Sequence, residues 1–265
     1  MEKLPLNEDR KEITPEFLAY QVHLPRDQWS LEFKNYINGI VQENIRVREG
    51  EWTEAERDVS QEAKEQSTYT RYLNGLRLSE DELRDKIILD LGSGDGEFVK
   101  YCIDKGITQN AYGVEARLAS EDNSAEETPF EKITIDERYK NNFFAQSYGE
   151  ELPVHNVDYV LSMASVTNMD WNGEEWEGVV KVLENSLAAL NENGEIRLWP
   201  IQEPAEATSV EMGSEVNDMW RERINEFAGD HDLQWELRPT NVIVTGSDND
   251  HIYLNSVLIF LKGKS

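Results

Sequence analysis

The sequence predicts an α/β fold: a doubly wound, mostly parallel seven-stranded sheet with an antiparallel C-terminal hairpin, preceded by a helical N-terminal extension. Three observations lead to this prediction. From residue 86 onward, short apolar runs alternate with helical patterns, which is typical of a parallel sheet covered on both faces. The first run, residues 87–91, breaks into three alternating glycines, as a buried strand does where the backbone turns sharply. The last two apolar runs have no convincing helical pattern between them.

The length of 265 residues leaves room for one large domain with an extension, or for two small domains. We favour the first, with a helical extension or lid over residues 1–85 and the main domain over residues 86–265. No run of about eighteen apolar residues occurs, so we expect no membrane-spanning helix. The N-terminus lacks a basic segment followed by an apolar one, so we expect no secretory signal and a cytoplasmic location.

The cysteine and histidine content argues against a metal site. Cys102 is the single cysteine, which permits no internal disulfide and no cysteine metal cluster. The histidines are not spaced as metal ligands, and His155 falls in the turn before a strand, at the wrong end of the sheet for a site. We therefore expect no metal.

The chain is strongly acidic, with 26 Lys plus Arg against 53 Asp plus Glu, a net charge of −27 and a pI near 4.4. Affinity for nucleic acid comes largely from cationic side chains, and we find no local basic patch, so a nucleic-acid partner is not expected. An acidic, solvated surface suited to a salty cytoplasm explains the charge. A cationic partner or substrate is the alternative.

The extension has helical patterns. One helix is predicted to open at Pro15, and a second after Ser30 carries an apolar stripe that we interpret as a docking face. A third is predicted from Trp52 toward Ala63, followed by the hydroxyl-rich segment 67–72. Ser79 and the acid three residues later have the spacing of a capping box for a short helix before the first strand. We expect this region to pack on the main domain, where it could form the lid.

In the main domain, helices are expected after the glycines as far as Gly106, from Trp176 to near Asn193 and Gly194, and from a cap at Ser214 to Gly229. The further strands are expected at 111–115, 142–147, 157–162, 195–200 (ended by Pro200), 233–238 and 253–261. The last two should form an antiparallel pair at the edge of the sheet.

The glycine loop after the first strand predicts a ligand site, because ligands of open parallel sheets bind at the carboxyl ends of the strands. Gly92, Gly94 and Gly96 form a G-x-G-x-G pattern, whereas the dinucleotide fingerprint needs its third glycine where this chain has Glu97. No lysine followed by Ser or Thr comes after the glycines, so a P-loop is unsupported. Asp95 and Glu97 would repel a pyrophosphate, which favours a ligand with a ribose and a positive charge.

An acid at the end of the second strand strengthens this prediction. Glu115 lies nineteen residues past Gly96 (115 − 96), about where an acid accepts hydrogen bonds from ribose hydroxyls. A glycine loop alone could be only a structural turn. The loop, the strand-end acid and the alternating element order together indicate an adenosyl site.

These segments resemble the class I S-adenosylmethionine-dependent methyltransferases, over residues 86 to the end. Residues 90–96 look like the family's first motif, 113–115 like its ribose-binding segment, and 150–154 with 158–162 and 187–198 like the segments around its fourth and fifth strands. The resemblance implies S-adenosyl-L-methionine as cofactor, S-adenosyl-L-homocysteine as product and a Rossmann-like methyltransferase fold. Gly92 to Gly96 would pass under the methionine part, Asp90 would orient the loop and Glu115 would hold the ribose. The cofactor contacts expected on this basis are Asp90, Gly92, Ser93, Gly94, Gly96, Glu115, Ala116, Tyr148, Gly149, Ser162 and Met163.

The chain departs from the family's pattern at Tyr148. Many members place an aspartate there, near the adenine amino group. The Tyr148 ring could stack on the adenine or lie at its edge, or Gln146 or a backbone carbonyl could receive the amino group.

The methyl acceptor is expected beyond the fourth strand, over residues 162–171. Members that methylate exocyclic amines or glutamine amides carry an Asn/Asp-Pro-Pro-aromatic motif here, which this chain lacks, and metal-dependent catechol types want acids where Ser162 stands. A catalytic base is optional, because in-line methyl transfer depends largely on close placement, and none is assigned. Loop Asn and Asp often cap turns and aromatic residues often pack in cores, which is the structural alternative for each candidate. The candidates for acceptor contacts are Tyr69, Tyr72, Ser165, Asn168, Asp170 and Trp171.

The sequence thus predicts an S-adenosylmethionine-dependent methyltransferase that acts on an O or N atom of a small molecule. Two alternatives stay open. The chain could be a non-catalytic cofactor-binding or scaffolding module of the same fold, since fold alone does not establish activity. It could also methylate RNA or protein.

Overall fold

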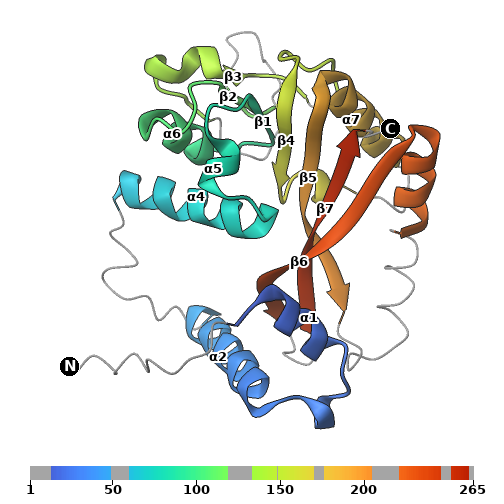
Figure 1. Cartoon of the computed structure of the whole chain (residues 1–265). Helices are drawn as coiled ribbons and strands as arrows, with labels where there is room; N and C mark the ends of the chain where they lie inside the picture. Colours follow the sequence, from blue (N-terminus) through green and yellow to red (C-terminus); the bar gives the residue numbers. More distant parts are fainter. Residues whose placement is uncertain are drawn as a thin grey trace.

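The computed structural model places a seven-stranded sheet between two layers of helices (Figure 1). The strand order is β3-β2-β1-β4-β5-β7-β6. β1 to β5 pair in parallel, whereas β7 runs antiparallel to both β5 and β6. This arrangement confirms the doubly wound, Rossmann-like fold with its antiparallel C-terminal hairpin. The structure describes residues 13–48, 60–118, 133–147, 149–169, 176–204, 221–245 and 252–262.

The strands follow the apolar runs of the sequence. Their residues alternate between the two faces of the sheet, so Ile88 packs in the core on one face and Leu89 in the core on the other. The strands are β1 (Ile88–Leu91), β2 (Ala111–Val114), β3 (Phe143–Phe144), β4 (Val157–Met163), β5 (Leu190–Pro204), β6 (Leu233–Thr245) and β7 (Ile252–Lys262).

The helices divide between the two faces. α4 and α6 pack on one face of the sheet, and α7 packs on the other together with the helix at 221–230. The last helix buries Ile224 and Phe227 as expected, while its expected cap, Ser214, lies outside the described residues. The helices and 3-10 segments (η) are α1 (Pro15–Val22), η1 (Arg26–Gln28), α2 (Leu31–Arg48), α4 (Gln61–Leu76), α5 (Glu80–Leu83), α6 (Glu97–Asp104), η2 (Glu137–Asn142), η3 (Val166–Asn168) and α7 (Trp176–Ala189). Among these described helices, none combines the length and the apolar character that crossing a bilayer requires.

Several element boundaries differ from the prediction. α7 ends at Ala189 and β5 begins at Leu190, whereas the helix was expected to end near 193–194 and the strand to begin at 195. β3 is only two residues long, whereas residues 142–147 were expected to be extended. β5 does not end at Pro200, because a register shift against β7 between Leu198 and Ile201 accommodates the proline, which has no N–H to donate. β6 likewise continues past residue 238, with a shift between Pro239 and Ile243.

The first two helices dock on the extended end of the C-terminal hairpin. Phe33 and Ile37, from the predicted apolar stripe of α2, are buried together with Leu18 of α1. They pack against Ile243 of β6 and Leu254 of β7. The apolar stripe is therefore a docking face, as predicted, and its partner is the end of the hairpin at Ile243 and Leu254, where β7 also pairs with the end of β5 (Figure 1).

The segment at 67–72, expected to lie outside a helix, is helical. α4 begins at Gln61, capped by the Ser60 hydroxyl, which accepts the Ala63 N–H, and it continues through residues 67–72. The residues predicted as the start of the third helix, 52–59, lie outside the described part. Hydroxyl side chains at 67–70 weaken the helical pattern, but Tyr69 and Tyr72 are buried on one face of α4. Tertiary packing thus overrides the local preference.

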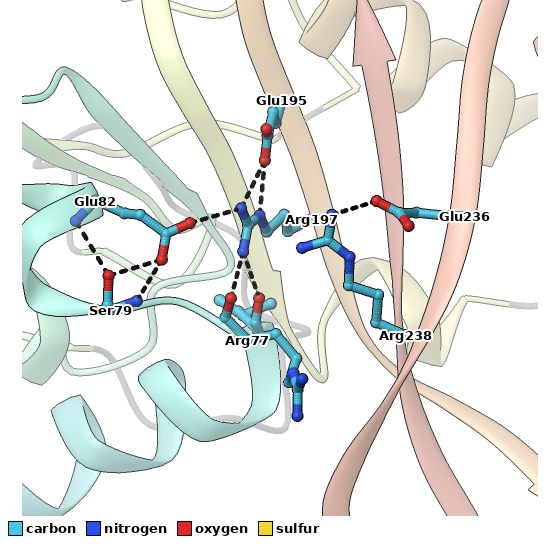
Figure 2. Close-up of polar contacts among 8 residues, drawn as sticks. Arg77, Ser79, Glu82, Glu195, Arg197, Glu236 and Arg238 are labelled. Carbon is cyan, nitrogen blue, oxygen red and sulfur yellow. Dashed lines mark hydrogen bonds and ion pairs between the residues drawn. The ribbon is translucent and has the colours of Figure 1, made fainter. Parts of the chain in front are cut away.

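A buried arginine fixes the end of α4 to the sheet (Figure 2). The Arg197 side chain on β5 is 2% exposed, and its guanidinium donates to the carbonyls of Leu76 and Arg77 at 3.0 and 2.6 Å. It also lies 3.3 Å from a Glu82 oxygen and 2.7 Å from a Glu195 oxygen. Carbonyls at a helix C-terminus lack intrahelical donors and carry partial negative charge, so a cation there satisfies both needs.

Glu82 also caps the N-terminus of the next helix, α5. Ser79 and Glu82 form the predicted capping box, with the Ser79 hydroxyl accepting the Glu82 N–H and the Glu82 carboxylate accepting the Ser79 N–H. Arg197 therefore joins the end of α4, the start of α5 and β5 in one polar cluster.

Candidate functional site

The predicted site lies at the carboxyl ends of β1, β2 and β4. The sheet order reverses at this point, because the chain passes from β1 to β2 on one side and later returns to β4 on the other. In open α/β sheets such a crevice is where ligands bind. The loop at 92–96 leads from β1 into α6 and borders the crevice.

Each glycine of the loop adopts a left-handed φ, +73° at Gly92, +54° at Gly94 and +74° at Gly96. A Cβ on Gly92 would lie 2.0 Å from the Ser165 hydroxyl, and one on Gly96 would lie 2.3 Å from the Phe143 ring. These two glycines therefore serve contacts within the protein. At Gly94 the nearest atom to such a Cβ is 3.8 Å away, so its backbone is the part of the loop that is open to a ligand.

Glu115, just past the end of β2, supports the open part of the loop. The residue is 6% exposed, and its Oε2 accepts the Gly94 N–H at 3.0 Å. Arg117 supplies the other donors, from its backbone N–H and its guanidinium. Burial on its own raises the pKa of Glu115, but the hydrogen bonds and charge of Arg117, with the Gly94 N–H, outweigh it and lower the pKa. Glu115 is thus an ionised acceptor placed beside the loop.

Asp90, the second acid, is buried completely at the end of β1. Its carboxylate accepts the Tyr72 hydroxyl at 3.0 and 3.2 Å, so it ties β1 to α4. Burial raises the pKa of Asp90 to about 7; the Tyr72 hydrogen bond opposes this rise and the charge of Glu115 adds to it. The sequence predicted that Asp90 orients the loop, and the structure shows it holding a neighbouring helix.

The sequence predicts that Tyr69 and Tyr72 wall the acceptor pocket. The structure places both side chains in the core. Each is 4% exposed, and both rings stack on Phe98 of α6, at centroid distances of 5.9 and 4.2 Å. Tyr69 also stacks on Tyr101 at 4.5 Å. They lie on the inner face of α4, where an aromatic side chain packs against α6, so the structural alternative holds for their rings.

The end of β4 is fixed by Ser162. Its hydroxyl is fully buried, donates to the Leu91 carbonyl at 3.2 Å and accepts the Val166 N–H at 3.1 Å. Met163 is also buried, with its terminal methyl next to Gly75 of α4. These side chains, predicted as cofactor contacts, join β4 to β1 and α4. A cofactor contact at either residue stays a prediction.

The turn after β4 lies beside the glycine loop. Ala164 is exposed and has a left-handed φ of +56°, which is uncommon for a residue other than glycine. Ser165 packs on Gly92, and the Asn168 amide donates to the Ala164 carbonyl at 2.6 Å. Asn168 therefore caps this turn, which is the structural alternative to a substrate contact.

The remaining predicted contacts fall into three groups. Ala116 is exposed after β2, and Gly149 is partly exposed in the turn after β3, so the backbone of both is accessible. Tyr148, Asp170 and Trp171 lie outside the described residues. Ser93 is 8% exposed and its hydroxyl has no hydrogen-bond partner among the described residues, next to Gly113. Within the described ranges, no group of three or more His, Cys, Asp or Glu is placed to hold a metal ion.

Sequence reasoning missed Arg117, Phe143 and Thr68. Arg117 stands two residues after the strand-end acid, a spacing that could have suggested the pair. Phe143 fills the space over two glycines, Gly96 and Gly113, which no local pattern reveals. The Thr68 hydroxyl donates to the Glu97 carboxylate at 2.5 Å, which brings α4 to the start of α6.

Comparisons with known proteins give structural matches at low sequence identity. No protein-family model matches the chain, and no curated protein matches it. Magnesium protoporphyrin IX methyltransferase from Synechocystis PCC 6803 with bound S-adenosylmethionine is 11% identical, covers 76% of this chain and 79% of its own, and has a TM-score of 0.41. The LepI complex with S-adenosylmethionine is 13% identical. The match covers 67% of this chain and 43% of the LepI chain, with a TM-score of 0.40. Precorrin-6y C5,15-methyltransferase from Geobacter metallireducens GS-15 is 17% identical. The match covers 75% of this chain and 88% of that methyltransferase, with a TM-score of 0.37.

Proposed function

We propose that this protein is an S-adenosyl-L-methionine-dependent methyltransferase that transfers a methyl group to an O or N atom of a small molecule, with S-adenosyl-L-homocysteine as the product. One observation carries the proposal. A buried, ionised Glu115 hydrogen-bonds the open glycine of a left-handed loop, where the sheet order reverses. An acceptor for ribose hydroxyls and an exposed backbone for the adjoining part of the ligand thus lie side by side.

The charges around the loop fit this cofactor better than a nucleotide phosphate. Asp95 is exposed on the loop, Glu97 opens α6, and Glu115 is ionised beside them. Acids at a helix N-terminus oppose the binding of a phosphate, which such a terminus otherwise favours. The same acids attract a cation such as a sulfonium. The residues present therefore fit the proposed cofactor.

The chemistry follows from this arrangement. Bound S-adenosylmethionine supplies an electrophilic methyl group on its sulfonium. The protein's part is placement: the Gly94 backbone and Glu115 hold the adenosyl portion, while the Tyr72–Asp90 contact keeps α4 against the end of β1. Close, aligned placement alone lowers the barrier of such a bimolecular step by several kcal/mol, on the order of 7 to 11 in the best cases.

A non-catalytic binding module is the second candidate, and one observation favours it. Residues 162–169, which follow β4 at the crevice, contain no side chain that titrates near neutral pH. An acceptor that needs a base would find none in this described segment. An RNA or protein acceptor is the third candidate, and the net charge of −27 weighs against RNA.

Calorimetric titration with S-adenosylmethionine tests the shared premise. Glu115→Gln should bind at least about ten-fold more weakly, because it replaces a charged acceptor of two hydroxyl hydrogen bonds. Glu226→Ala, which removes an exposed acid on the helix at 221–230, is the control and should bind as the unaltered protein does. No binding by the unaltered protein would rule out the enzyme and the module together.

A transfer assay then separates these two. Pools of small hydroxylated and amine acceptors are incubated with S-adenosylmethionine, and release of S-adenosylhomocysteine is measured. Product formation that Glu115→Gln abolishes supports the enzyme. Tight cofactor binding with no product from any pool favours the module. Product from RNA or protein pools only would show that the acceptor is RNA or protein and not a small molecule.

A further inference from the structure

The Glu115 carboxylate already has its full set of hydrogen bonds. Its Oε1 accepts the Arg117 N–H at 3.0 Å and the Arg117 Nε–H at 2.9 Å. Its Oε2 accepts the Gly94 N–H at 3.0 Å and an Arg117 Nη2–H at 3.1 Å. A carboxylate offers about four lone-pair sites. A ligand hydroxyl can therefore reach Glu115 only if one of these donors leaves.

The four donors differ in how easily they can leave. Two are backbone N–H groups, one in the tight loop and one directly after β2. The other two belong to the Arg117 guanidinium, whose side chain is 40% exposed, whereas that of Glu115 is 8% exposed. The exposed guanidinium keeps much of its hydration and regains more when it leaves, and salt screens its attraction to Glu115, so the guanidinium is released more easily than either backbone donor. The guanidinium is thus the donor group that a ligand can displace.

Displacement of the guanidinium frees one acceptor site on Oε1 and one on Oε2. That is the pattern two neighbouring hydroxyls of a ribose require. We propose that Arg117 is a counter-ligand of the cofactor site: it occupies Glu115 in the free protein, and the ribose diol displaces it. This inference rests on the proposed function and adds a residue that sets the affinity for the adenosyl ligand.

The inference predicts that removal of the Arg117 side chain strengthens binding. S-adenosylhomocysteine is the probe, because it lacks the sulfonium and so is not attracted merely by the loss of a nearby positive charge. Arg117→Ala should bind this probe about two- to five-fold more tightly, the factor that corresponds to an exposed ion pair of ordinary strength. The unaltered protein should approach the affinity of the variant as salt is raised, because salt weakens the competing ion pair.

Arg138→Ala is the matched control. Arg138 is also a half-exposed arginine, 3.4 Å from Asp104, but it lies in η2 at the amino end of β3, away from the loop. The two variants change the net charge equally, so an effect confined to Arg117→Ala cannot come from charge alone. Arg117→Gln is a second variant in case Arg117→Ala folds poorly, with the fold of each checked by circular dichroism.

Nuclear magnetic resonance of the arginine side chains gives an independent readout. The Arg117 Nε–H should be protected from exchange in the free protein and should lose this protection when S-adenosylhomocysteine binds. Tighter binding by Arg117→Ala with this release supports the inference. Equal or weaker binding by Arg117→Ala, with the unaltered protein still binding, overturns the inference and leaves the proposed function standing. No binding by either protein overturns both.

Discussion

Arg197 and Arg117 both pair with glutamates, but they differ in how firmly they are held. Arg197 is 2% exposed and spreads its donors over two helix-end carbonyls and two carboxylates from separate elements (Figure 2). Arg117 is 40% exposed, and two of its guanidinium N–H groups bind the Glu115 carboxylate. Removal of Arg197 would leave buried carbonyls without donors. Release of Arg117 would leave a carboxylate that still has two backbone donors.

This difference separates the part of the polar network that holds the fold from the part that a ligand can rearrange. Buried hydrogen bonds are expensive to leave unmade, so a residue that satisfies several of them acts as a clamp. A half-exposed guanidinium exchanges the carboxylate for water at little cost. The clamp fixes the C-terminal end of α4, and Tyr72 of the same helix reaches Asp90 from that position.

Replacement of the clamp should have the largest effect on stability. Arg197→Met should lower the free energy of unfolding by about 3 to 5 kcal/mol, because it leaves Leu76 and Arg77 carbonyls and two acids without their shared partner. Arg238→Met is the control: Arg238 lies on β6, is 43% exposed and pairs only with Glu236 among the contacts drawn in Figure 2. That variant should lose less than about 1 kcal/mol. Equal losses in urea unfolding of the two variants would refute the distinction.

Asp90 sharpens the comparison, because it is a buried acid whose partner is a tyrosine. Its pKa is raised to about 7 from 3.8, so the folded state keeps the proton that the unfolded state releases between about pH 4 and pH 7. The protein should therefore lose stability through Asp90 as the pH rises over that window. Below about pH 4 the contribution of Asp90 to stability is fully present. At about 1.4 kcal/mol for each pKa unit, the loss amounts to at most about 4 kcal/mol.

Urea unfolding of the unaltered protein and of Asp90→Asn across this window measures the loss. Asparagine does not titrate, so the unaltered protein should lose stability relative to Asp90→Asn as the pH rises from about 4 to 7. Other acids titrate in both proteins and cancel in the difference. A difference that does not change with pH would mean that Asp90 is ionised in the folded protein throughout.

The parts of the fold that depend on local patterns were predictable. The short apolar runs located β1, β2 and β4 closely, and the 3.6-residue pattern located α7, although that helix ends at Ala189 and not near Asn193. Pro200 was expected to end its strand, because the register shift that accommodates it depends on β7, more than fifty residues further along the chain. Residues 67–72 were expected outside a helix for a similar reason, since aromatic packing on α6, and not propensity, holds this part of α4.

The candidate site divides in the same way. The glycine loop and Glu115 could be found, because their spacing along the chain reflects a strand, a turn and a helix in succession. The partners of the two arginines and of Asp90 could not. Arg197 reaches a carbonyl 121 residues away in the sequence, and Tyr72 meets Asp90 across two elements. Such contacts leave no periodic trace in a single chain.

Removal of Arg117 should have the smallest effect on stability and so completes the comparison. Arg117→Ala should lower the free energy of unfolding by less than about 1 kcal/mol at pH 7, because its side chain is half exposed and Glu115 keeps its backbone donors. Arg117 helps to lower the pKa of Glu115, so its contribution is present above the ordinary carboxyl pKa near 4.5 and is lost as the pH falls and Glu115 takes up a proton. Urea unfolding of the variant and the unaltered protein at pH 7 and in acid tests both statements. A loss as large as that of Arg197→Met would show that Arg117 is a second clamp, and a clamp of that strength could not yield its place to a ribose.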